Sequence, residues 1–201
     1  PGLDGDGLIM CQRLGVDLAG VGIPVASTPG ILSADMPAPS GDVFSWSTMV
    51  APLGGAPFIM VNKNGERFTN ERANYLFIVD VLLDQPDKVS WAIFDENGRV
   101  HDTVPGLTYV KSGWEAELEA GLLKKADTIE ELAELVGIDP EGLVATIEAW
   151  NATAEAGEVP EFGERDYVEA IVEPPFYAAE VRTTISDPIC GVVINAQAQV
   201  I

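Results

Sequence analysis

The segment 67–75, which reads RFTNERANY, gathers many side chains that could take part in chemistry. Its hydrogen-bonding members are Arg67, Asn70, Glu71, Arg72, Asn74 and Tyr75. A tyrosine phenol has a pKa of about 10, so it is neutral at pH 7 and can still protonate a carbanion. Two interpretations are open: a solvated strand that returns from a hairpin turn, or the rim of an active site.

The elements around this segment predict how it is held. Asn64-Gly65 follows the apolar run PFIMV and predicts a hairpin between 58–62 and 67–68, with a type I′ turn that has positive φ at both central residues. The run LFIVDVLL then predicts a helix over about 72–84. Tyr75 would lie on its first turn, and Leu76, Phe77 and Ile78 would belong to the core.

Cap residues predict helices at 5–15, about 128–137 and 139–157, and a short helix is predicted at 114–120. Asp4 or Asp6 could cap the first, Thr128 and Glu131 form a capping box, and Asp139 precedes Pro140 at a helix start. Helical spacing predicts a buried apolar stripe on the first helix and on the last, formed by Leu8, Ile9, Cys11 and Leu14 and by Leu143, Ile147, Trp150 and Ala154.

Strands are predicted at 89–95, 176–185 and 191–201, where apolar and polar residues alternate or an apolar run is short. The segment 20–55 is rich in Pro, Gly and Ser without a sustained period, which is typical of a binding loop or an inter-domain crossing. Helices and strands are mixed without a βαβ rhythm, so the predicted fold class is α+β.

Composition excludes several classes of partner. The chain has 201 residues and is 47% hydrophobic, so it can bury a core. It carries a formal net charge of −21 and has only 11 Lys and Arg. Phosphate neutralisation needs clustered cations, which argues against binding to nucleic acid or to an anionic membrane surface. No apolar run reaches the length of a membrane span.

The sequence also lacks complete motifs for binding a metal ion or a dinucleotide. His101 is the single histidine, beside turn residues, so it predicts a solvated loop side chain and not a zinc ligand or a triad base. Cys11 and Cys190 lack metal spacing, and we expect a pair of buried thiols and not a disulfide. The stretch DGDG at 4–7 lacks the Glu of a calcium loop, because Gly15 stands there, and lacks the third glycine of a dinucleotide fingerprint.

The ends of the sequence favour a piece of a longer protein. The chain begins with Pro1 and stops on the alternating pattern GVVINAQAQVI without a closing element. An unpaired apolar strand edge is seldom left at the end of a natural protein.

The order of several short runs adds a family resemblance. These runs are GDGLIMCQRLGVDL, FIMVNKNGERFTNE, WAIFDE, ADTIEELAELVGIDPEGLVATIEAWNATAEAG, PPFYAAEV and GVVINAQAQVI. Together they span almost the whole chain and resemble the fumarate reductase and succinate dehydrogenase flavoprotein superfamily, in particular soluble fumarate reductases, urocanate reductases and 3-ketosteroid dehydrogenases.

The resemblance implies a domain organisation and a cofactor. Residues 21–186 would form a substrate-capping domain, inserted between 1–20 and 187–201, which would be pieces of an FAD-binding domain. FAD would be bound by the full-length parent and not by this fragment alone. The implied partners are a small-molecule substrate and the rest of the FAD-binding domain, and an electron-donor protein is left open as a further partner.

The resemblance also implies site residues. Gly5, Asp6 and Asp187 align with positions that contact FAD. Tyr75 occupies the place, counted forward from Glu71, where fumarate reductases have an arginine that donates a proton to the substrate. With that role, we expect RFTNE to brace the loop by hydrogen bonds and RANY to face the flavin.

Substrate histidines of those enzymes align with Thr28, before Pro29, and with Ser186 and Asp187, so Arg72 is the nearby cation that could bind substrate. Every matched position lacks its basic residue, and a tyrosine at the proton-donor place is similar to the ketosteroid dehydrogenases. The resemblance therefore implies an FAD-dependent oxidoreductase that acts on a C=C or CH–CH bond beside an electron-withdrawing group, in an enone or unsaturated acid. A fumarate reductase with a rearranged carboxylate clamp, or a non-catalytic acidic binding module, remain the alternatives.

Overall fold

A computed structural model describes residues 5–21, 24–32, 46–48, 58–101, 114–164, 168–188 and 190–201. The chain divides into two compact units. The terminal unit combines Pro1–Ser27 with Ile185–Ile201, and the central unit is Thr28–Thr184. Asp4 and much of the segment 20–55 lie outside the described residues.

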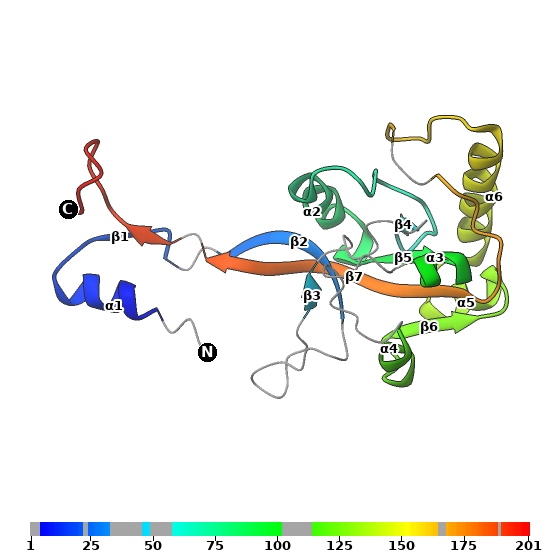
Figure 1. Ribbon diagram of the computed structural model, residues 1–201, viewed down its shortest axis with the longest axis horizontal. Coiled ribbons are helices and arrows are strands. Elements are labelled where there is room, and N and C mark those ends of the chain that lie inside the picture. Colours follow the sequence, from blue (N-terminus) through cyan, green and yellow to red (C-terminus); the bar gives the residue numbers. More distant parts are fainter. Residues whose placement is uncertain are drawn as a thin grey trace. The chain divides into compact units, whose positions relative to one another are not determined.

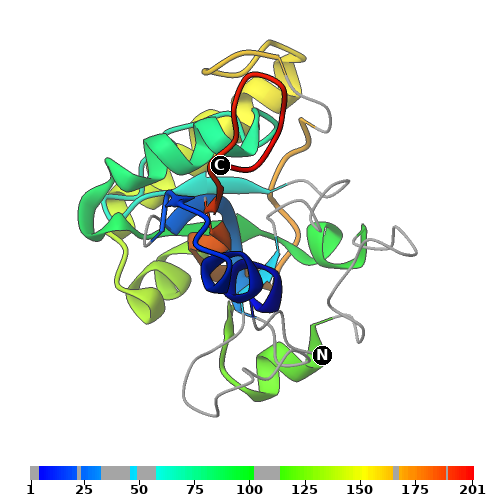
Figure 2. The ribbon, with the colours of Figure 1, turned by 90° about the vertical axis from the view of Figure 1, so that its left-hand side faces the viewer.

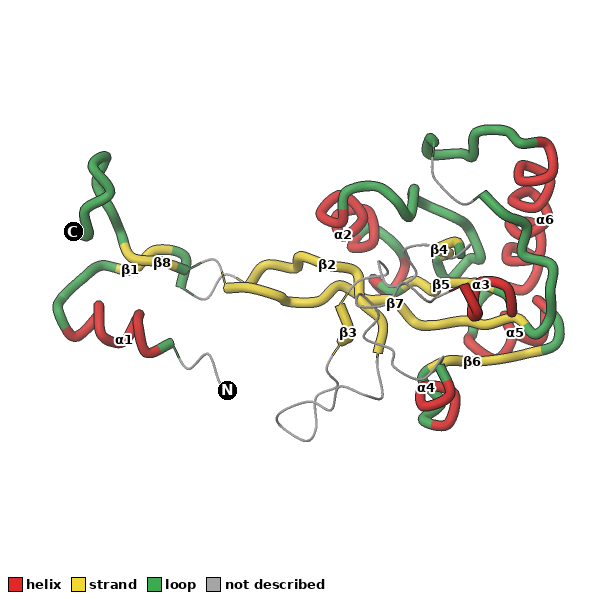
Figure 3. Tube along the Cα trace, in the orientation of Figure 1, coloured by secondary structure: helices red, strands yellow, loops and turns green. Residues whose placement is uncertain are grey.

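The central unit is built on an antiparallel sheet whose strand order is β3-β2-β7-β5-β4, with β6 also paired to β7 (Figures 1 and 3). The strands are β2 (Pro24–Leu32), β3 (Trp46–Thr48), β4 (Ile59–Val61), β5 (Ser90–Phe94), β6 (Leu123–Ala126) and β7 (Phe176–Pro188). β7 lies in the middle, because Ala178 pairs with Ile93 of β5 and with Lys124 of β6. β2 was not predicted, and its nine residues correct the expectation that 20–55 is irregular throughout.

The helices are α2 (Tyr75–Leu83), α3 (Glu96–His101), α4 (Glu115–Glu119), α5 (Ile129–Val136) and α6 (Pro140–Ala156), with a 3-10 turn at Pro86–Lys88. Figure 2 shows this unit from another side, with its helices around the sheet strands. The mixture of helices and antiparallel strands confirms the α+β prediction.

Both faces of the sheet are buried, because all five residues of β5 are buried and its side chains alternate between two cores. Ala92 and Phe94 pack in one core with α2 and with Trp114. Trp91 and Ile93 pack in the other core with α5 and α6. The sheet therefore holds α2, through Ile78 and Leu82, and α6, through Leu143, Ile147 and Trp150, in one packed unit.

Local signals placed α5 and α6 correctly. The Thr128 side chain accepts a hydrogen bond from the Glu131 amide at 3.1 Å, and Asp139 accepts one from the Glu141 amide at 3.3 Å. The α6 stripe Leu143, Ile147 and Trp150 is buried, as its spacing predicted.

The hairpin at 62–66 forms as predicted, but with another turn. The Gly65 amide donates to the Asn62 carbonyl and the Asn62 amide donates to the Glu66 carbonyl, both at 3.0 Å. Only Gly65 has positive φ, at 77°, which is the pattern of a type I turn followed by a left-handed glycine, so the type I′ prediction is wrong. The reason is Asn62, whose Oδ1 accepts from the Asn64 and Glu66 amides and fills the turn.

The terminal unit contains α1 (Asp6–Arg13) and the antiparallel pair β1 (Leu18–Ala19) and β8 (Gly191–Val192). The prediction of a strand over 191–201 is largely wrong. Asn195 bends the chain there, because its Oδ1 accepts from the Gln197 and Gln199 amides, and Ile194 pairs with Val200. α1 has no buried residue, so its predicted apolar stripe is not buried in the described structure.

Two further predictions need comment. His101 is the last residue of α3 and not part of a loop, so that prediction is wrong for its backbone. Cys11 and Cys190 are free thiols and only half-buried, so the expectation that they are buried is wrong. None of the helices in the described ranges is long and apolar enough to cross a bilayer.

Candidate functional site

Tyr75 is the first residue of α2 and is partly exposed, at 43%. Leu76 and Phe77 are also exposed, at 47% and 55%, so the expectation that they belong to the core is wrong, whereas Ile78 is buried. The helix begins at Tyr75 and not near residue 72, because Asn74 caps it by accepting a hydrogen bond from the Leu76 amide at 2.9 Å. Tyr75 and the two residues after it thus present side chains on an accessible helix start.

The residues before Tyr75 form a chain of hydrogen-bonded turns. Asn70 Oδ1 accepts from the Arg72 amide, and the Ala73 amide donates to the Asn70 carbonyl, both at 2.9 Å. Asn70 Nδ2 also donates to the Glu164 carbonyl at 2.9 Å, which ties this turn to the segment after α6. The backbone that leads into α2 is therefore held along its length.

A buried ion pair lies at the base of these turns. Arg67 Nε and Nη2 donate to the two oxygens of Glu71 at 2.9 and 2.8 Å, and the side chains are 7% and 0% exposed. Glu71 Oε1 also accepts from the Met60 amide of β4 at 2.9 Å. Such bidentate, charge-assisted bonding in a buried place fixes geometry strongly. These contacts confirm the prediction that RFTNE braces the loop.

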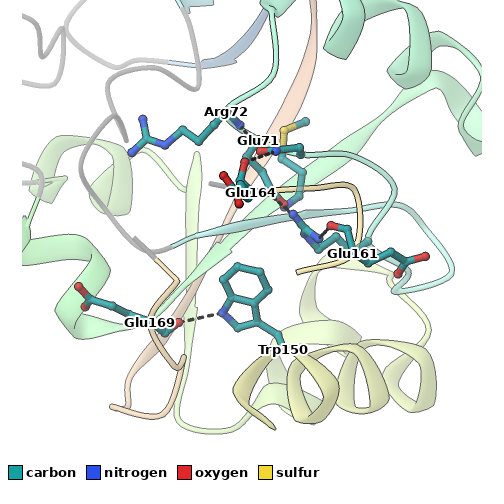
Figure 4. A network of polar contacts seen from close by, with 9 residues as sticks. Glu71, Arg72, Trp150, Glu161, Glu164 and Glu169 are labelled. Atoms are coloured by element: carbon teal, nitrogen blue, oxygen red, sulfur yellow. Dashed lines mark hydrogen bonds and ion pairs between the residues drawn. The ribbon is translucent and has the colours of Figure 1, made fainter. Parts of the chain in front are cut away.

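Arg67 is also contacted by Trp150 of α6 and by residues of the segment that follows α6. Its Nη1 donates to the Glu161 carbonyl at 2.6 Å. Its guanidinium lies 5.0 Å from the Trp150 ring centroid and 5.4 Å from that of Phe162. Figure 4 shows Trp150, Glu161 and Glu164 around this network, with the Trp150 indole donating to the Glu169 carbonyl at 2.8 Å.

Arg72 is half-buried and lines a cavity of about 580 Å³. The other lining residues are Ala154, Gly157, Glu158, Val159, Pro160, Glu164 and Val168. In Figure 4 the Arg72 side chain points away from Glu164 and Glu161. Two glutamates share this cavity with one arginine, so its described lining is not a purely cationic clamp for a dicarboxylate.

The other predicted site residues belong to different parts of the chain. Thr28 is the first residue of the central unit and lies in β2, whereas Ser186 and Asp187 lie near the end of β7 in the terminal unit. The side chains of these three residues lie outside what the structure describes. Gly5 and Asp6 lie at the start of α1.

In the described structure, the start of α1 has open space in front of its first amides. Gly5 has φ 73°, a Cβ added there would meet no atom within 4 Å, and no side chain among the described residues caps the helix. An open glycine before uncapped helix amides allows a polar cofactor group to approach closely. Gly5 and Asp6 therefore fit one edge of an FAD site.

A second polar cluster was missed by sequence reasoning. Tyr177 donates from its hydroxyl to Glu96 Oε2 at 2.6 Å, and Arg99 forms an ion pair with Glu96. Hydrogen bonding from Arg99 lowers the pKa of Glu96 to about 2, and burial raises the pKa of Tyr177 to about 12. The i,i+3 spacing of Glu96 and Arg99 would have predicted this ion pair if a helix had been predicted at 96–101. No group of three or more metal-ligating side chains gathers among the described residues.

Comparison with known protein families identifies the chain. A model described as the FAD binding domain matches residues 1–201. The chain belongs to this family. The match confirms the superfamily suspected from the sequence, and FAD is the cofactor of this family.

Several proteins that the chain resembles are oxidoreductases by name. The NADH:acrylate oxidoreductase of Vibrio harveyi is 29% identical over 201 residues, which are 100% of this chain and 18% of that protein. An open flavocytochrome c3 fumarate reductase matches with TM-score 0.69 and 25% identity over 98% of this chain and 31% of its own. The 3-ketosteroid Δ1-dehydrogenase of Sterolibacterium denitrificans matches with TM-score 0.70, covering 98% of this chain and 38% of its own; at 22% identity it shows the fold alone. The chain thus spans less than two fifths of each.

Proposed function

We propose that the central unit is the substrate-capping part of an FAD-dependent oxidoreductase that acts on a C=C or CH–CH bond beside an electron-withdrawing group. In this proposal the capping domain is residues 21–186, which contain the central unit and a few residues of the terminal unit on either side of it, and 1–20 and 187–201 belong to the FAD-binding domain. Family membership supports the cofactor, and the acrylate oxidoreductase and fumarate reductase among the relatives support the bond type.

The observation that carries the proposal is the position of Tyr75. It follows Glu71 by four residues, and Glu71 is bonded to Arg67 and to the Met60 amide, which anchors the turn to β4. Tyr75 itself is 43% exposed at a capped helix start, so its side chain is accessible to a substrate. A braced backbone with an accessible phenol suits a proton donor.

In this proposal FAD and the residues of the chain have separate roles in the reaction. When bound, FAD supplies the hydride transfer, and the substrate carbon next to the electron-withdrawing group then takes a proton, or loses one in the reverse direction. Tyr75 would hold that proton on its hydroxyl oxygen. Gly5, Asp6 and Asp187 would contact the cofactor at the edge of its site.

The charge pattern points to the substrate class. A dicarboxylate needs cations, and Thr28, Tyr75, Ser186 and Asp187 offer none at the positions that the resemblance implies. Arg72 is the substrate-binding candidate with a positive charge, and Glu158 and Glu164 share its cavity. An enone or a monocarboxylic unsaturated acid therefore fits better than fumarate.

The decisive test is Tyr75→Phe in the full-length protein. We expect turnover to fall roughly 10²–10⁴-fold, the usual contribution of general acid catalysis, with little change in KM or Tm. Tyr177→Phe is the matched control, because it removes a hydroxyl that is bonded to Glu96 in the fold and should leave turnover unchanged.

Reduced-flavin oxidation with a panel of enones and unsaturated acids separates the alternatives. Turnover with fumarate above all other substrates would favour a fumarate reductase with a rearranged clamp. No turnover with any substrate, in a protein that retains FAD, would favour a non-catalytic acidic module. An unchanged kcat in Tyr75→Phe would move the proton-donor assignment to Arg72.

A further inference from the structure

The Arg67 guanidinium is held by a set of contacts that we call the ring clamp. It consists of the Trp150 ring, the Phe162 ring and the Glu161 carbonyl. The rings lie 5.0 and 5.4 Å from Arg67 Cζ, and the carbonyl accepts from Nη1 at 2.6 Å. Arg67 at the same time holds both oxygens of Glu71. A cation between aromatic faces with its fork already bonded has little freedom to move.

The backbone at Phe162 is strained to make this contact. Phe162 has φ 71°, in the left-handed region that bulky residues rarely adopt. Its side chain is nevertheless 46% exposed, so burial alone does not explain the conformation. Strain of this kind persists where the surrounding structure requires it, and it gathers at functional sites. The strained turn places the Phe162 ring against Arg67.

The clamp is connected to Tyr75 through short, continuous steps. Glu71, gripped by Arg67, bonds the Met60 amide, and Asn70 next to it bonds the Glu164 carbonyl at 2.9 Å. From Asn70 the turn bonds run to Arg72 and Ala73, and Asn74 then caps α2. The segment 160–164 therefore fixes the backbone that carries Tyr75 at two points, although it lies about ninety residues later in the chain.

We propose that the ring clamp and the Asn70–Glu164 bond set the position of the Tyr75 hydroxyl, so that Phe162 and Asn70 are positioning residues for proton transfer. This inference rests on the proposed function of Tyr75. A displacement of about 1 Å at a reacting group can cost up to roughly 10²-fold in rate, so a loosened clamp should act on kcat.

The test uses Phe162→Leu in the full-length protein, with Phe162→Tyr as the conservative variant that keeps a ring. We expect Phe162→Leu to lower kcat roughly 5- to 50-fold with KM nearly unchanged, and Phe162→Tyr to restore most of it. Asn70→Ala, which removes the second tie, should have the same effect and serves if Phe162→Leu fails to fold. Equal loss in Phe162→Leu and Phe162→Tyr, or no loss in either, would overturn the proposal.

A double-mutant cycle separates positioning from general damage. In the Tyr75→Phe background, Phe162→Leu should cause no further loss of kcat, because the proton donor through which it acts is already gone. An equal loss in both backgrounds would show that the clamp acts elsewhere and would overturn the inference.

Amide hydrogen exchange at residues 72–76 distinguishes failure of the inference from failure of the proposed function. Phe162→Leu and Asn70→Ala should speed exchange there, with α5 unchanged. If Tyr75→Phe leaves kcat intact but exchange is faster, the proton-donor assignment fails and the positioning of this helix start stands. If exchange at 72–76 is unchanged, the positioning inference fails whatever the turnover shows.

Discussion

At the scale of single residues, the Asp95 side chain links two segments of the fold by accepting hydrogen bonds from three backbone amides. Its carboxylate is fully buried at the end of β5. Oδ1 accepts from the Gly98 amide at 2.9 Å, and Oδ2 accepts from the Val172 and Glu173 amides at 3.0 Å. One side chain thus starts α3 and holds the segment that leads into β7.

Asp95→Asn should therefore destabilise the protein by about 2–3 kcal/mol, because an amide NH₂ would face donors that now share a charged acceptor. Urea unfolding followed by circular dichroism measures the loss. Asp87→Asn is the control, since its ion pair with Lys63 is exposed and the midpoint should hardly move. Equal midpoints for the two variants would contradict this account of Asp95.

At the scale of elements, the hairpin at 62–66 touches the start of α6 so closely that two glycines are required. A Cβ on Gly142 would lie 1.9 Å from the Asn64 carbonyl oxygen, and one on Gly65 would lie 2.2 Å from the Leu143 amide nitrogen. The Asp139 amide also donates to the Lys63 carbonyl at 3.0 Å. The hairpin before Arg67 is therefore joined directly to the helix that carries Trp150.

We expect Gly142→Ala to cost about 1–3 kcal/mol, although alanine favours helices, because the hairpin must move away from α6. Gly7→Ala is the matched control, since an added Cβ in α1 meets no atom within 4 Å. Thermal unfolding of both variants checks this. A Gly142→Ala protein as stable as the parent would show that the hairpin moves without cost.

The contact between α3 and β7 should make stability depend on acid. The folded-state pKa of Glu96 is lowered to about 2, mainly by Arg99, below its usual value of about 4.5. A lowered pKa stabilises the fold above the unfolded value, and that contribution is lost as the pH falls from about 4.5 towards 2. The stability difference between the parent and Glu96→Gln should be constant above this window and shrink within it. A difference that persists unchanged at pH 2 would contradict the assignment.

Sequence reasoning succeeded where the signal was local. Thr128, Asp139 and the buried stripe of α6 predicted two helices because caps and periodicity act within a few residues. It failed where the deciding contact is distant: β2 depends on strand partners, and Phe162 takes its conformation against an arginine ninety-five positions earlier. Leu76 and Phe77 were assigned to the core from their hydrophobicity, which cannot reveal on which side a helix is covered. The bracing role of RFTNE was predicted, but its partners in the clamp were not.

At the scale of the whole molecule, the 201-residue chain by itself should not retain FAD. The candidate contacts Gly5, Asp6 and Asp187 would cover only an edge of the cofactor, and α1 has no buried residue in the described structure. Absorbance in the flavin region after incubation with FAD and desalting should be absent. A stoichiometric yellow complex would contradict the proposed assignment of residues 21–186 to a capping domain.

Hydrogen exchange should differ strongly between the two units. Amides of α1 should exchange much faster than those of α6, because α6 buries Leu143, Ile147 and Trp150. Mass spectrometry of peptides from 6–13 and 140–156 measures this directly. Equal protection would contradict the unequal burial of the two helices.

The terminal unit is assembled from both ends of the chain, which imposes an order on biosynthesis. β1 is synthesised before the central unit, but Leu18 and Ala19 pair with Val192 and Gly191, which are synthesised after it. At about 5–20 residues per second, translation of the central unit between them takes on the order of ten seconds. The nascent chain can complete the sheet around β7 only near the end of that interval, and β1 must wait for its partner until the whole central unit has been translated.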